Sequence, residues 1–404
     1  MYNFSPSTEQ EELLARARKI MEEDVYPAEK HIIPGVGLPA EILKPIQQKV
    51  KEQNLWAAHL PIEIGGLGLG NVFLGLLNEI LGSSPIGPRC FGTAAPDTGN
   101  TEILLKAGTP KQIEKYLKPV INDDIRSCFA MTEPDVSGAD PTGIQTSAVR
   151  DGNEWVLNGK KWFASNAGLS SFAIVMAVTN PDAAPHERAS MFIVDIGTPG
   201  FELIRDIAVM GDFSEGGHWE IHLNNCRIPA ENILGKEGEG FKLAQMRLGP
   251  GRITHAMRWL GVMNRSFDLM IEYALKRKTR GKPLAEFQTI QNFIADSAAE
   301  ISASRLMTLH AAWKMDQGED ARKEIALIKF YGAKILNDVI SRAIQVHGSL
   351  GYSKDTPLEA FYREARAAHI YDGPDEVHRM VVAKRYLKEY QMKKNEELVE
   401  NSAR

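Results

Sequence analysis

The residues best suited to proton chemistry stand in two short segments in the second half of the chain. Residues 371–376 read Tyr-Asp-Gly-Pro-Asp-Glu, and residues 249–252 read Gly-Pro-Gly-Arg. A carboxylate shielded from water has its pKa raised toward neutrality, where it can accept a proton from carbon. Asp372 could act in this way. The residues alone favour a plainer interpretation, in which Asp372 caps a helix beginning at Pro374 and Arg252 is an exposed helix arginine.

A third segment is strongly basic. Residues 277–282 read Arg-Lys-Thr-Arg-Gly-Lys, and Gln288 follows. The planar guanidinium group is suited to binding phosphate through parallel hydrogen bonds. Taken alone, a charge run of this kind is more often a solvated turn. Both interpretations stay open on the residues.

Two further segments combine aromatic and hydroxyl side chains. Residues 129–134 read Phe-Ala-Met-Thr-Glu-Pro, and residues 161–166 read Lys-Trp-Phe-Ala-Ser-Asn. The dipeptide Asn-Gly at 158–159 favours a tight hairpin turn, because both central residues of such a turn need positive φ. We therefore predict a β-hairpin that turns at 158–159. Successive strand residues face opposite sides, so one of Trp162 and Phe163 should lie in the core.

The composition limits what these segments can belong to. The chain has 404 residues, 43% of them hydrophobic and 25% charged, so we expect a globular protein with two or three packed regions. With a net charge of −5, the chain shows no excess of basic residues that could neutralise the phosphates of a nucleic-acid duplex. We therefore expect no nucleic-acid partner. The three cysteines are far apart and odd in number, which predicts neither a disulfide framework nor a metal site and suits a reducing compartment.

The sequence predicts no insertion into a membrane. No stretch approaches the roughly 20 apolar residues that cross a bilayer. The first 23 residues carry early acidic residues and no uninterrupted apolar run, so they do not read as a signal peptide. We expect a soluble protein with no membrane span.

The elements that must position the candidate residues begin with a helical region over 1–125. Residues 7–20 start with hydroxyl residues followed by glutamates and continue with apolar residues at helical spacing. Further apolar helices are predicted over 72–81 and 101–107.

A glycine-rich run at 65–70 does not predict a dinucleotide-binding fold. After Gly66 and Gly68 such a fold requires glycine at position 71, which is Asn71, and no strand with an acidic end follows at the right distance. A tight surface loop is the better prediction.

The remainder of the chain predicts a β region over 126–240 and helices over 241–404. Besides the hairpin, short β-branched or aromatic runs occur at 172–178, 191–195 and 219–223, separated by turn residues. After them the helical period returns in several long apolar stripes, which implies a bundle. The predicted fold class is α+β.

Taken in their order along the chain, these segments resemble the acyl-CoA dehydrogenase family. The resemblance also rests on residues 61–68 (Pro-Ile-Glu-Ile-Gly-Gly-Leu-Gly) and 345–351 (Gln-Val-His-Gly-Ser-Leu-Gly). It implies three domains: an N-terminal all-helical domain (1–125), a middle β-barrel or sandwich domain (126–240) and a C-terminal four-helix bundle (241–404).

The resemblance also implies a reaction, the FAD-dependent oxidation of an acyl-CoA thioester to its trans-2-enoyl-CoA. A carboxylate removes the α-proton, and hydride leaves the β-carbon for flavin N5. The family base is usually glutamate, and Asp372 matches its position in a minority subgroup with aspartate, some of whose members are fused to a kinase-like domain. Another base position used in the family, near Gly251, has no carboxylate here. The Asp372 N–H and a ribityl hydroxyl would stabilise the thioester enolate.

Arg252 matches a family arginine near the base and the substrate, where it could hold Asp372 and tune its pKa. The resemblance places the substrate against Gly249, Arg252, Tyr371 and Gly373. Several family members have a larger residue than Gly249, which hints at a roomier pocket.

The flavin-binding residues are likewise implied by the resemblance. Phe163 and Ser165 stand where the family commonly has Trp and Thr, so an aromatic wall and a hydroxyl are kept, and we assign Phe163 to the flavin side. The full implied set is Phe129, Met131, Thr132, Ser137, Phe163, Ser165, Arg277, Thr279, Gln288, Gln345, His347, Gly348, Ser349, Pro374 and Glu376.

Family partners follow from the same resemblance. Arg277, Thr279 and Gln288 match residues that reach the adenosine diphosphate half of FAD on a neighbouring subunit, which implies a homo-oligomer, either a dimer or a dimer of dimers (a homotetramer). An electron-transfer flavoprotein would accept the electrons, as in fatty acid β-oxidation. We expect a cytoplasmic protein in a bacterium, and otherwise the peroxisome or the mitochondrial matrix.

Two alternatives remain open. A flavin oxidase of the same fold would reduce oxygen and act on an acyl-CoA or a nitroalkane, and a related nitroalkane oxidase also uses an aspartate base. Such oxidases often have an added C-terminal domain, whereas this chain ends at Arg404, which favours a dehydrogenase. A catalytically silent FAD-binding assembly factor would not need Asp372 and Arg252.

Overall fold

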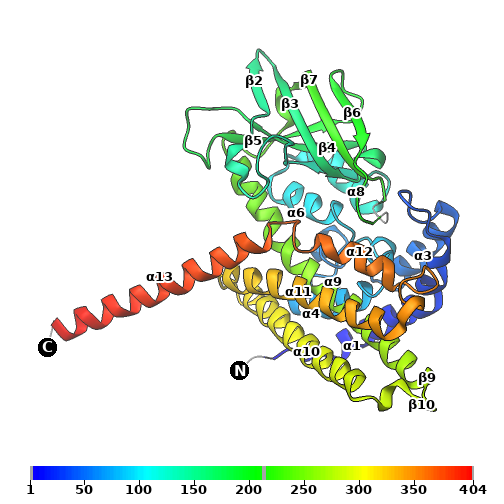
Figure 1. Cartoon of the computed structure of the whole chain (residues 1–404). Helices are drawn as coiled ribbons and strands as arrows, with labels where there is room; N and C mark the ends of the chain where they lie inside the picture. Colours follow the sequence, from blue (N-terminus) through cyan, green and yellow to red (C-terminus); the bar gives the residue numbers. More distant parts are fainter. Residues whose placement is uncertain (1–2, 212–214, 403–404) are drawn as a thin grey trace. The chain divides into compact units, whose positions relative to one another are not determined.

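Helices precede and follow a central group of strands in the computed structural model, which describes residues 3–211 and 215–402, with side chains up to residue 398 (Figure 1). The predicted α+β class and the order of helical, β and helical regions are confirmed. By compactness the chain divides into two units, residues 6–251 and residues 252–404 together with 1–5.

The helical part of the first unit contains the helices that the sequence predicts. Ser7 begins the first helix with a capping box, in which its side chain accepts a hydrogen bond from the Gln10 N–H and the Gln10 side chain accepts one from the Ser7 N–H. The helices are α1 (Thr8–Ile20), α2 (Tyr26–Ala28), α3 (Ala40–Glu52), α4 (Gly70–Leu81), α5 (Gly87–Cys90), α6 (Asp97–Ala107), α7 (Pro110–Gln112) and α8 (Lys118–Asn122).

The glycine-rich run forms a tight loop before α4, as predicted. A Cβ at Gly66 would lie 2.0 Å from the Leu60 carbonyl oxygen, so only glycine fits this close approach. The run therefore shapes a turn of the main chain.

An eight-stranded sheet makes up the rest of the first unit. Its order is β6-β7-β3-β2-β4-β5-β8, and β1 pairs with β4 in parallel. The strands are β1 (Ser127–Ala130), β2 (Ser147–Asp151), β3 (Glu154–Ser165), β4 (Phe172–Val178), β5 (Ala189–Asp195), β6 (Phe201–Asp206), β7 (His218–Pro229) and β8 (Ile233–Leu234).

Strand β4 is buried on both faces and carries the core of this unit. Ala173 and Val175 belong to a cluster of sheet residues, whereas Phe172 and Ile174 pack with side chains of α6, among them Leu104. A strand covered on both sides has no solvent face, which explains its continuous apolar sequence. The prediction of this strand from its apolar residues is confirmed.

The predicted hairpin turn at Asn158-Gly159 is wrong. Strand β3 continues through this dipeptide, and the turn that joins β2 to β3 contains Gly152, whose φ is +59°. A Cβ at Gly159 would lie 2.6 Å from Thr146 Oγ1, so glycine is needed for a close approach between strands. Asn158 Oδ1 accepts a hydrogen bond from the Asn225 N–H at 2.8 Å, beside an extra residue in β7. The dipeptide accommodates a bulge in the neighbouring strand.

The second unit is a bundle of long helices. The first of them, α9 (Gly240–Lys276), begins in the first unit and is followed by a short hairpin of β9 (Lys278–Thr279) and β10 (Lys282–Pro283). The others are α10 (Gln288–Asp316), α11 (Arg322–His347), α12 (Leu358–Ala367) and α13 (Asp375–Ser402). Helix α11 packs against α10, α12 and α13. Helix α13 extends well beyond the other helices of its unit (Figure 1).

Two absences concern the described residues alone. None of their helices is both long and apolar enough to cross a membrane. Within the same residues, no group of three or more His, Cys, Asp or Glu side chains could hold a metal ion.

Candidate active site

Asp372 lies in a short connection between α12 and α13 and has a left-handed main chain. Its φ is +54°, and Gly373 follows with a φ of +99°. A residue other than glycine is strained in this region, so surrounding contacts must hold it. Arg252 Nε donates a hydrogen bond to the Asp372 carbonyl oxygen at 2.8 Å, and His378 Nε2 donates to the same oxygen at 3.2 Å. Helices α9 and α13 therefore both fasten this peptide.

Lys329 on α11 fastens the connection from a third side. Its ammonium group donates to the Ala368 carbonyl oxygen at 2.6 Å and to the Gly373 carbonyl oxygen at 3.3 Å, and its side chain is 0% exposed. Burial lowers the pKa of Lys329 to about 8, and the charges of Asp375 and Asp372 oppose this shift. Through these two hydrogen bonds the buried amine links Ala368, next to the end of α12, to Gly373, which follows Asp372.

The Asp372 carboxylate faces a histidine on α9. His255 Nε2 lies 3.3 Å from Asp372 Oδ2, and the two side chains are 22% and 20% exposed. Burial lowers the pKa of His255, the Asp372 carboxylate opposes the shift, and the charges of Arg258 and Lys329 add to it. Burial likewise lowers the pKa of Arg258 to about 10. The carboxylate is thus within reach of solvent, beside a histidine whose charged form is disfavoured, the buried Lys329 and the partly buried Arg258.

Tyr371 packs behind the carboxylate. Its ring lies 4.6 Å from the His255 ring, and its hydroxyl accepts a hydrogen bond from Trp259 Nε1 at 2.9 Å. Burial raises the pKa of Tyr371, so its hydroxyl stays protonated. Tyr371 and Gly373, both assigned to the substrate from sequence, flank Asp372 directly.

If Asp372 capped helix α13, the helix would begin at the next residue, Gly373, but it begins two residues later. Its first residue is Asp375, and the Pro374 carbonyl oxygen accepts hydrogen bonds from the Val377 and His378 N–H groups. Pro374 therefore occupies the cap position, and the prediction that Asp372 caps this helix is wrong. Glu376 is exposed in the first turn.

Arg252 holds the main chain of the candidate base. Its hydrogen bond goes to the carbonyl oxygen of Asp372, while burial lowers the pKa of Arg252 and the Asp372 charge opposes that shift. Gly249, one turn earlier on α9, belongs to the first unit, and among the described residues of that unit nothing lies within 4 Å of the place where its Cβ would stand.

On the sheet, Phe163 occupies a bulge in β3. Lys161 pairs with Ile221 and Ala164 with Trp219, so two residues of β3 stand opposite one residue of β7. Phe163 has a left-handed φ of +49° and is 44% exposed. The expectation that either Trp162 or Phe163 lies in the core is wrong, because the bulge breaks the alternation of faces. Trp162 is partly exposed and meets the Phe163 ring edge-on at 5.2 Å.

Thr132 lies beside this bulge. Its Oγ1 donates to the Trp162 carbonyl oxygen at 2.9 Å, and the Trp162 N–H donates to the Thr132 carbonyl oxygen at 3.1 Å. The loop that contains the exposed Ser137 also approaches Thr132. A Cβ at Gly138, the next residue, would lie 3.2 Å from Thr132 Cγ2. Ser165 follows the bulge, with its hydroxyl 2.8 Å from His218 Nδ1.

A buried ion pair fixes the segment that carries Met131 and Thr132. Lys161 Nζ donates to the Met131 carbonyl oxygen at 2.9 Å and to Glu133 Oε1 at 2.8 Å. Glu133 also accepts hydrogen bonds from the Gln145 and Thr146 N–H groups. Burial lowers the pKa of Lys161, opposed by the Glu133 charge. Phe129, on β1, has the Arg247 guanidinium 4.1 Å from its ring centroid.

The phosphate-clamp candidates gather at one end of the second unit. The His347 ring stacks on Tyr273 with centroids 4.3 Å apart, which brings the end of α11 next to the end of α9, where Arg277 and Thr279 follow. His347 is buried, and its Nδ1 donates to the Ala343 carbonyl oxygen. The exposed members are Arg277, Thr279, Gln288, Gln345, Gly348 and Ser349. The positive φ of Gly348, +62°, suits a close main-chain approach.

These surfaces suit a flat cofactor with a phosphate tail. Phe163 presents an apolar ring at a strained position, and Thr132 and Ser165 place hydroxyl groups near it. At the end of the bundle, Arg277 adds a guanidinium group that can bind a diphosphate. Taken unit by unit, the residues present fit the parts of a flavin dinucleotide, those of the first unit its ring and those of the second its diphosphate.

The sequence did not point to His255 or Lys329. His255 lies three residues after Arg252, and residues at this spacing share one helix face, so the helical period could have drawn attention to it. Lys329 lies in the middle of α11 with no motif around it. Its part in the site depends on packing between helices.

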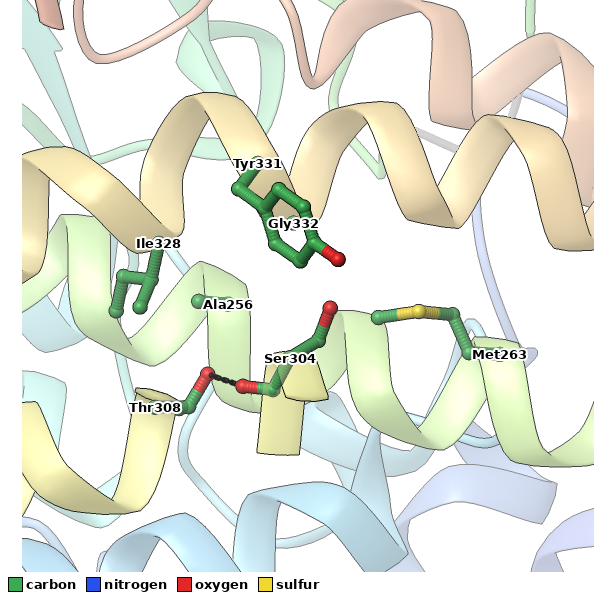
Figure 2. A pocket seen from close by; sticks show the side chains of 7 residues that line it. All are labelled: Ala256, Met263, Ser304, Thr308, Ile328, Tyr331 and Gly332. Carbon is green, nitrogen blue, oxygen red and sulfur yellow. Dashed lines mark hydrogen bonds between the residues drawn. The ribbon is translucent and has the colours of Figure 1, made fainter. Parts of the chain in front are cut away.

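A narrow gap in the bundle is separate from these residues. It is lined by Ala256 and Met263 of α9, Ser304 and Thr308 of α10, and Ile328, Tyr331 and Gly332 of α11. The Ser304 and Tyr331 hydroxyl groups point into it in Figure 2. The gap has no room even for a water molecule, and in the described part of the chain Ser304 Oγ has no hydrogen-bond partner. The gap is a packing defect of the bundle.

Comparison with family models gives three matches that follow one another along the chain. They are the N-terminal domain (residues 7–124), the middle domain (128–226) and the C-terminal domain (238–387) of acyl-CoA dehydrogenases.

Two named relatives are similar over most of the chain. A probable acyl-CoA dehydrogenase, FadE2, of Mycobacterium tuberculosis is 45% identical over 348 residues, which are 85% of this chain and 85% of the relative. Acyl-CoA dehydrogenase family member 11 of Rattus norvegicus is 40% identical over 402 residues. That match covers 96% of this chain but 51% of the rat protein, so the chain spans about half of that relative's length.

Solved structures share the fold. A putative acyl-CoA dehydrogenase from Mycobacterium abscessus superposes with a TM-score of 0.90 at 37% identity, covering 96% of this chain and 100% of the other. An FAD complex of PigA superposes with a TM-score of 0.86 at 26% identity, covering 95% and 99%.

Proposed function

The chain belongs to the acyl-CoA dehydrogenase family, and on that premise we propose that it oxidises an acyl-CoA thioester to the trans-2-enoyl-CoA with Asp372 as its base. The enzyme class is that of an FAD-dependent oxidoreductase. FAD, when bound, accepts the hydride that leaves the β-carbon.

The geometry of Asp372 is the observation that carries the proposal. Its carboxylate is 20% exposed, and its strained peptide is held by Arg252, His378 and Lys329 from three helices. Aspartate is one methylene shorter than the usual family glutamate, so its main chain must bring it nearer to the α-carbon. A fixed main chain of this kind supports a short side chain as the base.

The proton moves from the α-carbon to an oxygen of Asp372. Lys329 is buried, and Arg252 and Arg258 are partly buried. These three cations near the carboxylate favour negative charge in the site both before the transfer and on the enolate after it. By family resemblance, the Asp372 N–H donates to the thioester carbonyl oxygen. Gly249, Arg252, Tyr371 and Gly373 are the residues proposed to contact the substrate.

For the cofactor, we propose two groups of residues. Phe129, Met131, Thr132, Ser137, Phe163 and Ser165 hold the flavin ring and its edge. Arg277, Thr279, Gln288, Gln345, His347, Gly348, Ser349, Pro374 and Glu376 hold the remainder of FAD, with the arginine on its diphosphate.

Contacts of Arg277, Thr279 and Gln288 with FAD on a neighbouring subunit would make a homo-oligomer, a dimer or a dimer of dimers. The exposed apolar side chains of Tyr386, Leu387 and Tyr390 on α13 are suited to an interface between copies. An electron-transfer flavoprotein is the proposed acceptor, in fatty acid β-oxidation. The three buried free cysteines suit a reducing compartment.

Anaerobic reduction of the bound flavin tests the proposal. A panel of acyl-CoA thioesters of different chain length and branching is added to the FAD-bound protein, and loss of the oxidised flavin band is followed. We expect at least one thioester to bleach the band, and Asp372→Asn to keep its FAD but lose the reduction. If no thioester bleaches the band, the proposed function is wrong.

Electron acceptors distinguish a dehydrogenase from an oxidase. Enzyme reduced by its substrate is mixed with an electron-transfer flavoprotein or with oxygen, and reoxidation is timed. Fast reoxidation by the flavoprotein supports the proposal. Fast reoxidation by oxygen, or reduction by a nitroalkane in place of a thioester, would assign the chain to the oxidases of this fold.

A further inference from the structure

We propose that His255 is a positioning residue for the catalytic base, holding one oxygen of the Asp372 carboxylate so that the side chain keeps a single orientation. The inference rests on the proposed function of Asp372 as the base. It concerns a residue that neither the family resemblance nor any sequence motif identified.

The two residues meet at the carboxylate. His255 Nε2 lies 3.3 Å from Asp372 Oδ2, while Arg252 Nε lies 2.8 Å from the Asp372 carbonyl oxygen. His255 and Arg252 are three residues apart on α9 and therefore project from the same face. One helix thus holds the base at two atoms, one in the main chain and one in the side chain.

An aspartate carboxylate needs such a partner. Its last torsion joins an sp³ carbon to an sp² carbon and has broad minima, so the two oxygens exchange places easily when nothing holds them. The left-handed main chain fixes where the Cβ points but not how the carboxylate turns. A ring nitrogen at Oδ2 removes that remaining freedom.

The imidazole ring is itself fixed. It packs against Tyr371 with centroids 4.6 Å apart and lies parallel to Trp259 at 6.3 Å, with 24° between the planes. The Tyr371 hydroxyl is in turn held by Trp259 Nε1. The two aromatic side chains leave the histidine little room to turn away from Asp372.

Burial disfavours the charged form of the His255 ring, and the groups around it act in both directions. Arg252 and Arg258 lie on its own helix, Lys329 comes from α11, Tyr371 and Asp372 from the connection, and His378 from α13. Burial lowers the pKa of His255, and Arg258 and Lys329 lower it further, while Asp372 opposes them. A neutral ring with its proton on Nε2 donates to the carboxylate, and this nitrogen then has no lone pair with which to accept a proton from the substrate. His255 therefore orients the base without competing with it.

Three variants test this role by the pH dependence of flavin reduction. His255→Leu removes the donor, His255→Gln keeps an N–H donor in its amide, and His31→Gln changes an exposed histidine of the first unit as a matched control. Each is prepared with FAD bound, and the rate of anaerobic reduction by the best acyl-CoA is measured against pH together with the apparent affinity for the thioester.

We expect the leucine variant to keep FAD and thioester affinity but to reduce its flavin about 10- to 100-fold more slowly. The acid limb of its profile moves to higher pH, because a carboxylate that loses a hydrogen-bond donor takes up its proton more readily. The glutamine variant recovers most of the rate, and the control equals the wild type. An unshifted acid limb in a leucine variant that still binds FAD would overturn the proposal.

A second measurement does not depend on turnover. Protein labelled with ¹³C in its histidine rings is titrated by NMR, and the His255 signal is assigned from its absence in His255→Gln. The pKa of His255 should fall in Asp372→Asn, because the carboxylate that opposes the downward shift is gone. An equal pKa in both proteins would show that the two groups are not coupled. This result stands even if no thioester reduces the wild-type flavin, so a failure of the proposed function is distinguished from a failure of the pairing.

Discussion

Arg252 and Asp372 meet through the main chain of the aspartate. The Arg252 Nε donates to the Asp372 carbonyl oxygen at 2.8 Å, although 120 residues separate them in the sequence. An arginine beside a carboxylate usually forms an ion pair with it and lowers its pKa. Here the guanidinium group fastens the peptide in its left-handed conformation, so its first task is to place the proposed base.

Replacement of Arg252 should therefore slow proton removal more than it weakens cofactor binding. In Arg252→Gln we expect flavin reduction to fall about 100-fold, because a displacement of the base of about 1 Å costs this much. The measurement is single-turnover anaerobic reduction with FAD affinity determined in parallel. Arg18→Gln, an exposed arginine of α1, is the control. Equal rates in both variants would contradict the role of Arg252.

Replacement of Lys329 should destabilise the protein. In Lys329→Met the carbonyl oxygens of Ala368 and Gly373 lose their buried donor, which costs about 2 kcal/mol of unfolding free energy. Denaturant unfolding of the FAD-bound proteins measures the difference. Lys19→Met, an exposed lysine of α1, should change stability little. A Lys329→Met protein as stable as the wild type would contradict this account.

Lys329 should also make stability depend on pH. Its pKa is about 8 in the folded protein and about 10.4 in an unfolded chain. Between these values the unfolded state binds more protons, so the contribution of Lys329 to stability rises with pH. We expect the gap in unfolding free energy between wild type and Lys329→Met to widen from about pH 8 to about pH 10. A constant or narrowing gap over this range would refute the assignment.

Phe163 should contribute to FAD binding and, through its strained main chain, lower the stability of the protein. Its left-handed φ of +49° is strained for an aromatic residue, and its ring is 44% exposed. In Phe163→Gly we expect FAD affinity to fall about fivefold, because ring stacking contributes about 1 kcal/mol. Unfolding of the apoprotein should not become easier, since glycine relieves the strain. The control is Ile204→Ala, another exposed apolar residue of the sheet, which should leave FAD affinity unchanged. Unaltered FAD affinity in Phe163→Gly would remove this residue from the site.

Removal of the Ser304 hydroxyl should stabilise the bundle. Ser304 is 3% exposed and its Oγ has no hydrogen-bond partner in the described chain, so its burial is unfavourable. We expect Ser304→Ala to raise the unfolding free energy by about 1 kcal/mol. In the neighbouring Thr308→Val, which loses the hydrogen bond from Thr308 Oγ1 to the Ser304 carbonyl oxygen, we expect no gain. Denaturant unfolding compares them, and a loss of stability in Ser304→Ala would show that its hydroxyl is satisfied.

Local sequence determined much of the fold. The capping box at Ser7, the helix over 70–81 and strand β4 depend on residues close together in the chain, whose spacing shows in the sequence. The motif around Asp372 is local in the same sense, and its resemblance to a family was enough to indicate the base.

Tertiary structure decided what depends on residues far apart. The Asn158-Gly159 dipeptide became part of a strand because Thr146 and Asn225 approach it, and the bulge at Phe163 arises from its pairing with β7. His255 and Lys329 lie next to the candidate base through the packing of α9 and α11, which no motif records. The sequence by itself determined which residue is the candidate base, whereas the residues that hold it were decided by contacts between distant helices, since such contacts leave no pattern in neighbouring residues.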